Sequence, residues 1–111
     1  MKTRKMGTGI VLSTITCAWM AVMSAPLHAA DGAAVYEKSC KMCHSTGMGN
    51  APKVGDVDAW KALIAKGRDE LYDNAINGIN VKGMMPARGG NSSLSDDEVK
   101  AAVDHMLELS E

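Results

Sequence analysis

The sequence predicts a small all-α domain, and three observations carry this prediction. The chain has 111 residues, which is about the length of one domain. Its apolar residues recur at helical spacings in several separate segments, as they do in amphipathic helices. No segment shows the alternation of apolar and polar residues that is typical of a half-buried strand. We therefore expect about four helices joined by glycine-rich loops.

The first 30 residues differ from the rest of the chain. Three basic residues precede residues 10–23, which carry no charge and are mostly apolar or small, and Ala29 and Ala30 follow. This order is typical of a secretory signal peptide over residues 1–30, cleaved between Ala29 and Asp31. The apolar stretch is short for a membrane span, which needs about 20 residues. We expect no transmembrane span in the mature form, with an uncleaved anchor as the alternative.

The mature domain, residues 31–111, has a composition that restricts its partners. It carries 9 basic and 13 acidic residues, a net charge of −4. A nucleic-acid-binding domain would be expected to carry a basic face, so we predict no nucleic-acid partner. Only Cys40 and Cys43 remain after removal of the leader, too few for a disulfide scaffold.

The first helix is expected to begin at Gly32, with Asp31 as its N-cap, and to run into residues 40–44. Gly32, Tyr36 and Cys40 follow one another at intervals of four and therefore share one face. A glycine on that face lets a second helix backbone approach closely.

The middle of the chain predicts two shorter helices between two loops. The first loop spans residues 45–57, and Asp58 is expected to cap a helix over residues 59–66, with Gly67 just past its end. A third helix is expected over residues 70–77, followed by the second loop, residues 78–93. A loop of this length in so small a domain usually has a function.

The last helix has the clearest start signal. Ser95 and Glu98 have the spacing of a capping box, and acidic residues fill the first turn. The expected buried stripe consists of Val99, Ala102, Val103 and Met106.

The segment Cys40-Lys41-Met42-Cys43-His44 carries the chemistry. Two cysteines three positions apart, followed at once by histidine, form the attachment motif of c-type haem. Thiols on one short helical turn can each add across one of the two vinyl groups on the same edge of a porphyrin. A zinc site would commonly need a second such pair, which the chain lacks, and a thioredoxin-like site would need strands. The motif therefore predicts one covalent haem c with His44 as an iron ligand.

The motif alone does not identify the second iron ligand. Met84 and Met85 lie in the long loop, next to Pro86, with enough chain after His44 to cross over the ring. Methionine also fills irregular core gaps, but two adjacent methionines in a loop are less readily explained in that way. His105 is the rival, although its place beside the apolar stripe of the last helix favours a packing or surface role.

The chain resembles the class I c-type cytochromes, and among them the small bacterial cytochrome c5 family. The resemblance covers residues 32–107. It rests on five segments besides the haem motif: Gly32-x-x-x-Tyr36, Ala51-Pro52-Lys53-Val54-Gly55-Asp56, Ala59-Trp60, Met85-Pro86-x-x-Gly89-Gly90 and Ser95-Asp96-Asp97-Glu98-Val99-Lys100-Ala101-Ala102-Val103.

The resemblance implies a class I cytochrome c fold and assigns further roles. Met85, directly before Pro86, matches the axial methionine, so that His44 and Met85 would be the metal ligands. Pro52 matches the proline whose carbonyl accepts a hydrogen bond from the axial histidine, a contact that orients a ligand. His105 departs from the family, which usually has an aromatic residue there.

We therefore expect a periplasmic electron-transfer protein that is not an enzyme and serves a respiratory or similar redox chain. Its partners would be redox proteins, and the exposed haem edge is also a candidate surface for a weak dimer. Lys41, Lys53, Lys82 and Arg88 are expected near that edge, where they could steer an acidic partner. The alternatives are a haem subunit of a larger oxidase complex and a ligand-binding haem sensor with an open sixth position.

Overall fold

The computed structural model describes residues 30–80 and 85–111. All of the predicted signal peptide except Ala30 lies outside these residues, as do Lys82 and Met84. Within the described ranges, no helix has the length and apolar character that crossing a membrane would require.

The all-α prediction is confirmed in the part of the chain that the structure describes. The helices are α1 (Gly32–Val35), which continues through the π-helix η1 (Tyr36–Cys40) into α2 (Lys41–His44), then α3 (Val57–Ile64), α4 (Arg68–Asn77) and α5 (Asp96–Glu108). Two short 3₁₀ turns, η2 (Met48–Asn50) and η3 (Ala87–Gly90), lie in the two loops. The one β-bridge in the described ranges pairs Ile79 with Met85.

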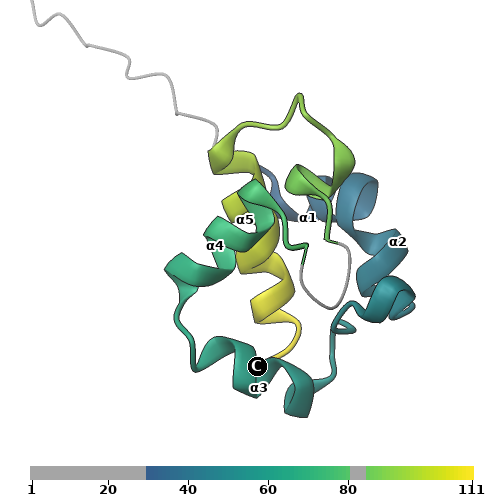
Figure 1. Ribbon diagram of the computed structural model, residues 1–111, viewed down its shortest axis with the longest axis vertical. Helices are drawn as coiled ribbons and strands as arrows, with labels where there is room; N and C mark the ends of the chain where they lie inside the picture. The colour runs from purple at the N-terminus through teal and green to yellow at the C-terminus, as the bar shows by residue number, and fades with distance from the viewer. Residues whose placement is uncertain (1–29, 81–84) are drawn as a thin grey trace, which may run out of the picture.

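The helix α5 lies at the centre of the domain, with α4 beside it and the N-terminal helix packed against it (Figure 1). A side chain at Gly32 would place its Cβ against the carbonyl of Ala101, because the backbones of α1 and α5 cross in contact there. The close approach predicted at Gly32 is therefore confirmed. Tyr36 is buried on the same face, and its ring lies 5.4 Å from that of His105, which takes the aromatic position on α5.

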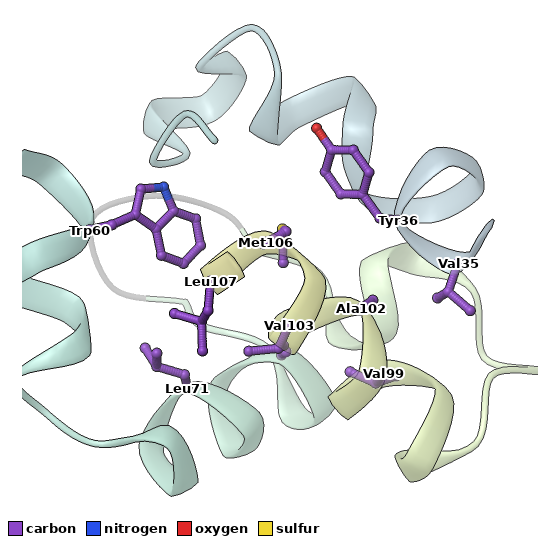
Figure 2. Close-up of a cluster of buried hydrophobic side chains, with 10 residues drawn as sticks. Val35, Tyr36, Trp60, Leu71, Val99, Ala102, Val103, Met106 and Leu107 are labelled. Carbon is purple, nitrogen blue, oxygen red and sulfur yellow. The ribbon is translucent and has the colours of Figure 1, made fainter. Parts of the chain in front are cut away.

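The core lies along one face of α5. The predicted stripe of Val99, Ala102, Val103 and Met106 is buried, and Leu107 is buried as well. Trp60 of α3 and the Leu71 and Ala75 side chains of α4 complete the cluster. In Figure 2, Leu107 is directed toward Leu71, whereas Met106 lies on the side of α5 that faces the space between Trp60 and Tyr36.

Local sequence signals predicted some helix starts correctly and others wrongly. Asp31 caps α1, and Ser95 with Glu98 forms the capping box of α5, as predicted. The predicted cap at Asp58 is wrong: α3 begins at Val57, because the Asp56 carboxylate accepts from the amide of Ala59. Either aspartate could cap a helix, and only Asp56 reaches a free amide at the end of the loop.

The start predicted for the next helix is also wrong by two residues, whereas its predicted end at Asn77 is confirmed. The helix α4 begins at Arg68, and Gly67, which was expected to follow the end of α3, is instead the N-cap of α4 with φ of +98°. The link between the two helices therefore lies two residues earlier than predicted, and Gly67 adopts this left-handed conformation without steric cost.

Candidate functional site

An apolar cavity, partly open to solvent, lies between the N-terminal helix, the two loops and the inner faces of α3, α4 and α5. The space between its lining atoms is about 1030 Å³, including the open mouth. All five residues predicted to bind the cofactor line it: Cys40, Cys43, His44, Pro52 and Met85.

His44 is buried at the end of α2, and its orientation is set by one hydrogen bond. Its Nδ1 lies 2.9 Å from the carbonyl oxygen of Pro52. A carbonyl only accepts, so Nδ1 must carry the proton and Nε2 keeps a free lone pair. This is the tautomer in which a neutral imidazole can bind a metal through Nε2. The hydrogen bond expected from the family pattern is thus present.

The loop that carries Pro52 is itself held from three directions. The amide of Val54 donates to the His44 carbonyl at 2.8 Å, and Trp60 Nε1 donates to the Lys53 carbonyl at 2.8 Å. The amide of Gly55 donates to the hydroxyl of Ser110, a residue that is almost fully buried. The sequence analysis missed the roles of Trp60 and Ser110, because neither contact follows from spacing along the chain.

The two cysteines lie one helical turn apart beside His44, and both thiols are free and partly exposed. Burial raises the pKa of the Cys40 thiol, and the neighbouring Cys43 raises it further. The Cys40 thiol therefore stays protonated at neutral pH. The π-helical turn η1 lies directly before the cysteine pair, and in it the backbone amide of Lys41 donates to the carbonyl of Tyr36, five positions back, instead of to the carbonyl four positions back.

Met85 reaches the cavity from the other loop and is partly buried against the core. Its backbone is paired with Ile79 through two hydrogen bonds, of 2.9 Å from the Ile79 amide and 3.2 Å from the Met85 amide. The chain just after α4 therefore sets the position of Met85. Gly78 permits this arrangement, because a Cβ there would lie 2.8 Å from the Met85 carbonyl oxygen.

The other candidate ligands lie in different places. His105 does not line the cavity and packs on Tyr36 instead. Met42 and Met48 are largely exposed, with 73% and 54% of their surface accessible. Met106 lines the cavity, but as a member of the predicted buried stripe on α5.

These residues fit a covalently held porphyrin. The wall is largely apolar, as a flat aromatic ring requires, and it carries two neighbouring thiols, an imidazole with a free nitrogen and a thioether. Elsewhere in the described ranges, no three His, Cys, Asp or Glu side chains gather into a metal site.

The sequence matches the protein family described as "Cytochrome C oxidase, cbb3-type, subunit III" over residues 28–106. It is also 54% identical over 80 residues to a cytochrome c-555 of Chlorobaculum thiosulfatiphilum, a match that covers 71% of this chain and 93% of the relative. The chain belongs to the class I c-type cytochromes. It is related to the c5 and c-555 types and is a monohaem electron carrier, not an enzyme.

Other relatives agree with this membership. A cytochrome c5 of Azotobacter vinelandii is 45% identical to this cytochrome over 83 residues, which cover 73% of the chain and 96% of the relative. Among solved structures, a mono-haem ferrocytochrome c from Shewanella putrefaciens matches with a TM-score of 0.60 and 34% identity. The cytochrome in an electron-transfer complex with nitrite reductase matches with a TM-score of 0.66 and 34% identity. Each structural match covers 73% of this chain and 95% of the other.

The charges near the site of this cytochrome are mostly paired within the chain. Lys41 forms an ion pair with Glu37 at 2.7 Å, and Arg88 forms one with Asp96 at 2.6 Å. Of the four basic residues expected to steer a partner, only Lys53 is described and has no ion pair within residues 30–80 and 85–111. Electrostatic steering of an acidic partner by the described basic residues would therefore be weaker than the sequence suggests.

Proposed function

We propose that this cytochrome carries one electron on a single haem c, held by thioether bonds to Cys40 and Cys43 and ligated by His44 and Met85. Support comes from the geometry around His44: the bond to Pro52 leaves Nε2 free, and Met85 lines the same cavity. When bound, the haem supplies one-electron exchange between Fe(III) and Fe(II). With both axial positions filled by protein, oxygen and peroxide would have no open coordination site.

Each residue has a separate task in this proposal. Each thiol would add across one vinyl group of the haem, so that the sulfur bonds one vinyl carbon and the thiol hydrogen passes to the other, and no oxidant would be needed. The thioether of Met85 would raise the reduction potential relative to a second histidine. The apolar wall keeps water from the ring and adds to the same effect.

The ligand assignment has a direct spectroscopic test. The oxidised protein should show the weak far-red charge-transfer band of a methionine–iron bond. Met85→Ala should abolish this band, and the neighbouring variant Met84→Ala should retain it. Loss of the band in Met84→Ala with retention in Met85→Ala would transfer the ligand role to Met84. Rapid carbon monoxide binding by the reduced wild type would favour a ligand-binding sensor.

The location and the redox chain belong to the same proposal. We expect residues 1–30 to be removed on export to the periplasm, which the mass of the purified mature protein would show directly. The cytochrome would then exchange electrons with protein partners of a respiratory or similar chain. One solved relative is bound to nitrite reductase, so a docked enzyme is a reasonable kind of partner to test.

A second candidate is a haem subunit of a larger oxidase. The matched family, whose description names an oxidase subunit, favours it. Fractionation of cells that produce the native protein separates the two. A free carrier appears in the soluble periplasmic fraction, whereas a subunit copurifies with membranes and with other oxidase chains.

A further inference from the structure

We infer that Arg88 is a positioning residue that holds Met85 at the cavity by tying its loop to the start of α5. The inference rests on the proposed ligation of iron by Met85. It goes further by naming the contact that resists detachment of this ligand.

The loop is fixed at Met85 by backbone pairing. Met85 exchanges two hydrogen bonds with Ile79, and Gly78 lets the chain at Met85 and Ala87 approach closely. These contacts hold the backbone of Met85 against the end of α4. They do not reach the residues that follow Ala87, so a second attachment is needed to prevent the loop from tilting away from the cavity.

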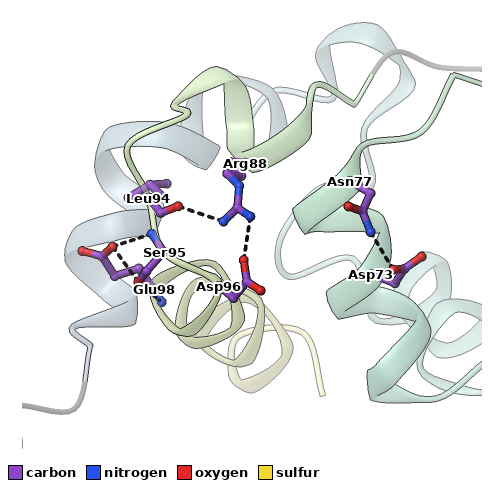
Figure 3. A network of polar contacts seen from close by, with 7 residues as sticks. All are labelled: Asp73, Asn77, Arg88, Leu94, Ser95, Asp96 and Glu98. Atoms are coloured by element: carbon purple, nitrogen blue, oxygen red, sulfur yellow. Dashed lines mark hydrogen bonds and ion pairs between the residues drawn. The ribbon is translucent and has the colours of Figure 1, made fainter.

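Arg88 provides this second attachment, and its backbone is unusual. Its φ is +56°, a left-handed conformation that a residue other than glycine adopts rarely and at a cost. Such a conformation persists where the surrounding contacts impose it. Here the guanidinium donates to the Leu94 carbonyl at 2.8 Å and to the Asp96 carboxylate at 2.6 Å (Figure 3).

The two hydrogen bonds of Arg88 contribute unequally to holding the loop. The Asp96 side chain is 58% exposed, so water and salt screen its pairing with Arg88. The bond to the Leu94 carbonyl is partly buried, and the Arg88 side chain is only 26% exposed. The Leu94 bond is therefore the main attachment. Leu94 also lies beside Met85 in a small apolar space lined by both residues and by Gly89.

The two hydrogen bonds of Arg88, to Leu94 and to Asp96, form the Arg88 clamp, and a contact on the third side of the loop adds to it. A Cβ at Gly89 would lie 2.5 Å from the carbonyl oxygen of Ser39, in the turn that leads into the cysteine pair. The loop is therefore enclosed by the end of α4, by η1 and by the start of α5. In the described part of the chain, the side-chain hydrogen bonds of η3 are the two of Arg88, to Leu94 just before α5 and to Asp96 at its first residue.

The consequence concerns competition for the iron. An added ligand such as imidazole binds only when Met85 has detached, so its apparent affinity is proportional to the detached fraction. The Arg88 bond to Leu94 belongs to the attached loop. Its loss should raise the imidazole affinity of the oxidised protein about tenfold, which corresponds to about 1.4 kcal/mol. This is the size expected for one partly exposed hydrogen bond from a charged group.

The experiment is imidazole titration of oxidised holoprotein, followed through loss of the far-red band. Arg88→Gln should bind imidazole about tenfold more tightly than the wild type, by the hydrogen-bond energy above. Arg88→Lys should fall between the two, because one ammonium cannot reproduce the guanidinium fork. It also serves as the milder variant if Arg88→Gln folds poorly. Asp96→Asn should have a small effect.

Arg68→Gln is the matched control. Arg68 also bonds an aspartate of α5, Asp104, but from α4 and away from the cavity lining. The imidazole affinity of the Arg68→Gln variant should stay at the wild-type value. Equal affinities in Arg88→Gln and Arg68→Gln would overturn the role of Arg88. A wild type without the far-red band, or a Met85→Ala variant that keeps it, would overturn the proposed ligation instead.

Discussion

The two walls of the cavity are built in different ways. On the His44 side, the ligand and its partner Pro52 are eight positions apart, and their loop is tied by the amide of Val54, the indole of Trp60 and the hydroxyl of Ser110. On the Met85 side, two backbone bonds to Ile79 and the Arg88 clamp hold a loop between elements that are distant in sequence.

This difference predicts that Met85 detaches from the iron more readily than His44. The His44 side has several independent bonds, and in the proposed holoprotein the thioether links at Cys40 and Cys43 hold the same turn. Loss of one contact there should lower the stability of the whole domain. The Met85 side has no such covalent link, so loss of one contact there should act on ligand exchange before it unfolds the protein.

The largest effect is expected from Gly89→Ala. The new Cβ would collide with the Ser39 carbonyl, and φ of +61° strains any residue other than glycine. Overpacking costs about 1–3 kcal/mol, and the left-handed backbone adds about 1–2 kcal/mol. Thermal unfolding of the holoprotein should show the combined loss, and the far-red band should weaken.

Gly90→Ala is the matched control, since Gly90 has φ of +81° and nothing within 4 Å of its Cβ position. It should show only the backbone cost of about 1–2 kcal/mol and keep its far-red band. Equal losses in the two variants would mean that the contact with Ser39 does not hold the Met85 side.

An intermediate effect is expected from Trp60→Phe on the His44 side. The change removes the donor to the Lys53 carbonyl and leaves that oxygen without its partner, which costs about 1–3 kcal/mol. Denaturant unfolding should show the loss, while the imidazole affinity should stay at the wild-type value. A large rise in imidazole affinity would contradict the division between the two sides.

The smallest effect is expected on the acid sensitivity of the capping box at the start of α5, the helix end to which Arg88 is bonded. Hydrogen bonds from the backbone and then the hydroxyl of Ser95 lower the pKa of Glu98 below its usual value. The capping contribution is therefore complete above the pKa that Glu98 has in the unfolded chain, and is lost as the pH falls through the lower folded value. Glu98→Gln should flatten the fall in unfolding midpoint below about pH 4.3.

Glu108→Gln provides the comparison for this variant, since Glu108 is an exposed glutamate at the last residue of the same helix. It should leave the acid dependence of unfolding close to that of the wild type. A wild-type slope in Glu98→Gln would show that the capping box does not contribute to acid sensitivity.

Local signals predicted most of the fold. Asp31, Ser95 and Glu98 each act on amides within a few residues, so their capping roles could be predicted from the sequence. The start of α3 could not, because Asp56 and Asp58 offer equivalent carboxylates, and the loop decides which of them reaches a free amide. Leu107 was missed although it follows Val103 by four positions and is buried as part of the same stripe.

The sequence by itself determined the chemistry of this cytochrome. Cys40, Cys43 and His44 are adjacent, so one helical turn is enough to bring two thiols and an imidazole to one cavity. Only the tertiary structure decided how the opposite wall is held. The contact of Gly89 with Ser39 joins segments that are far apart in sequence, and the contacts of Arg88 with Leu94 and of Ile79 with Met85 lie within a loop whose path no local spacing rule predicts.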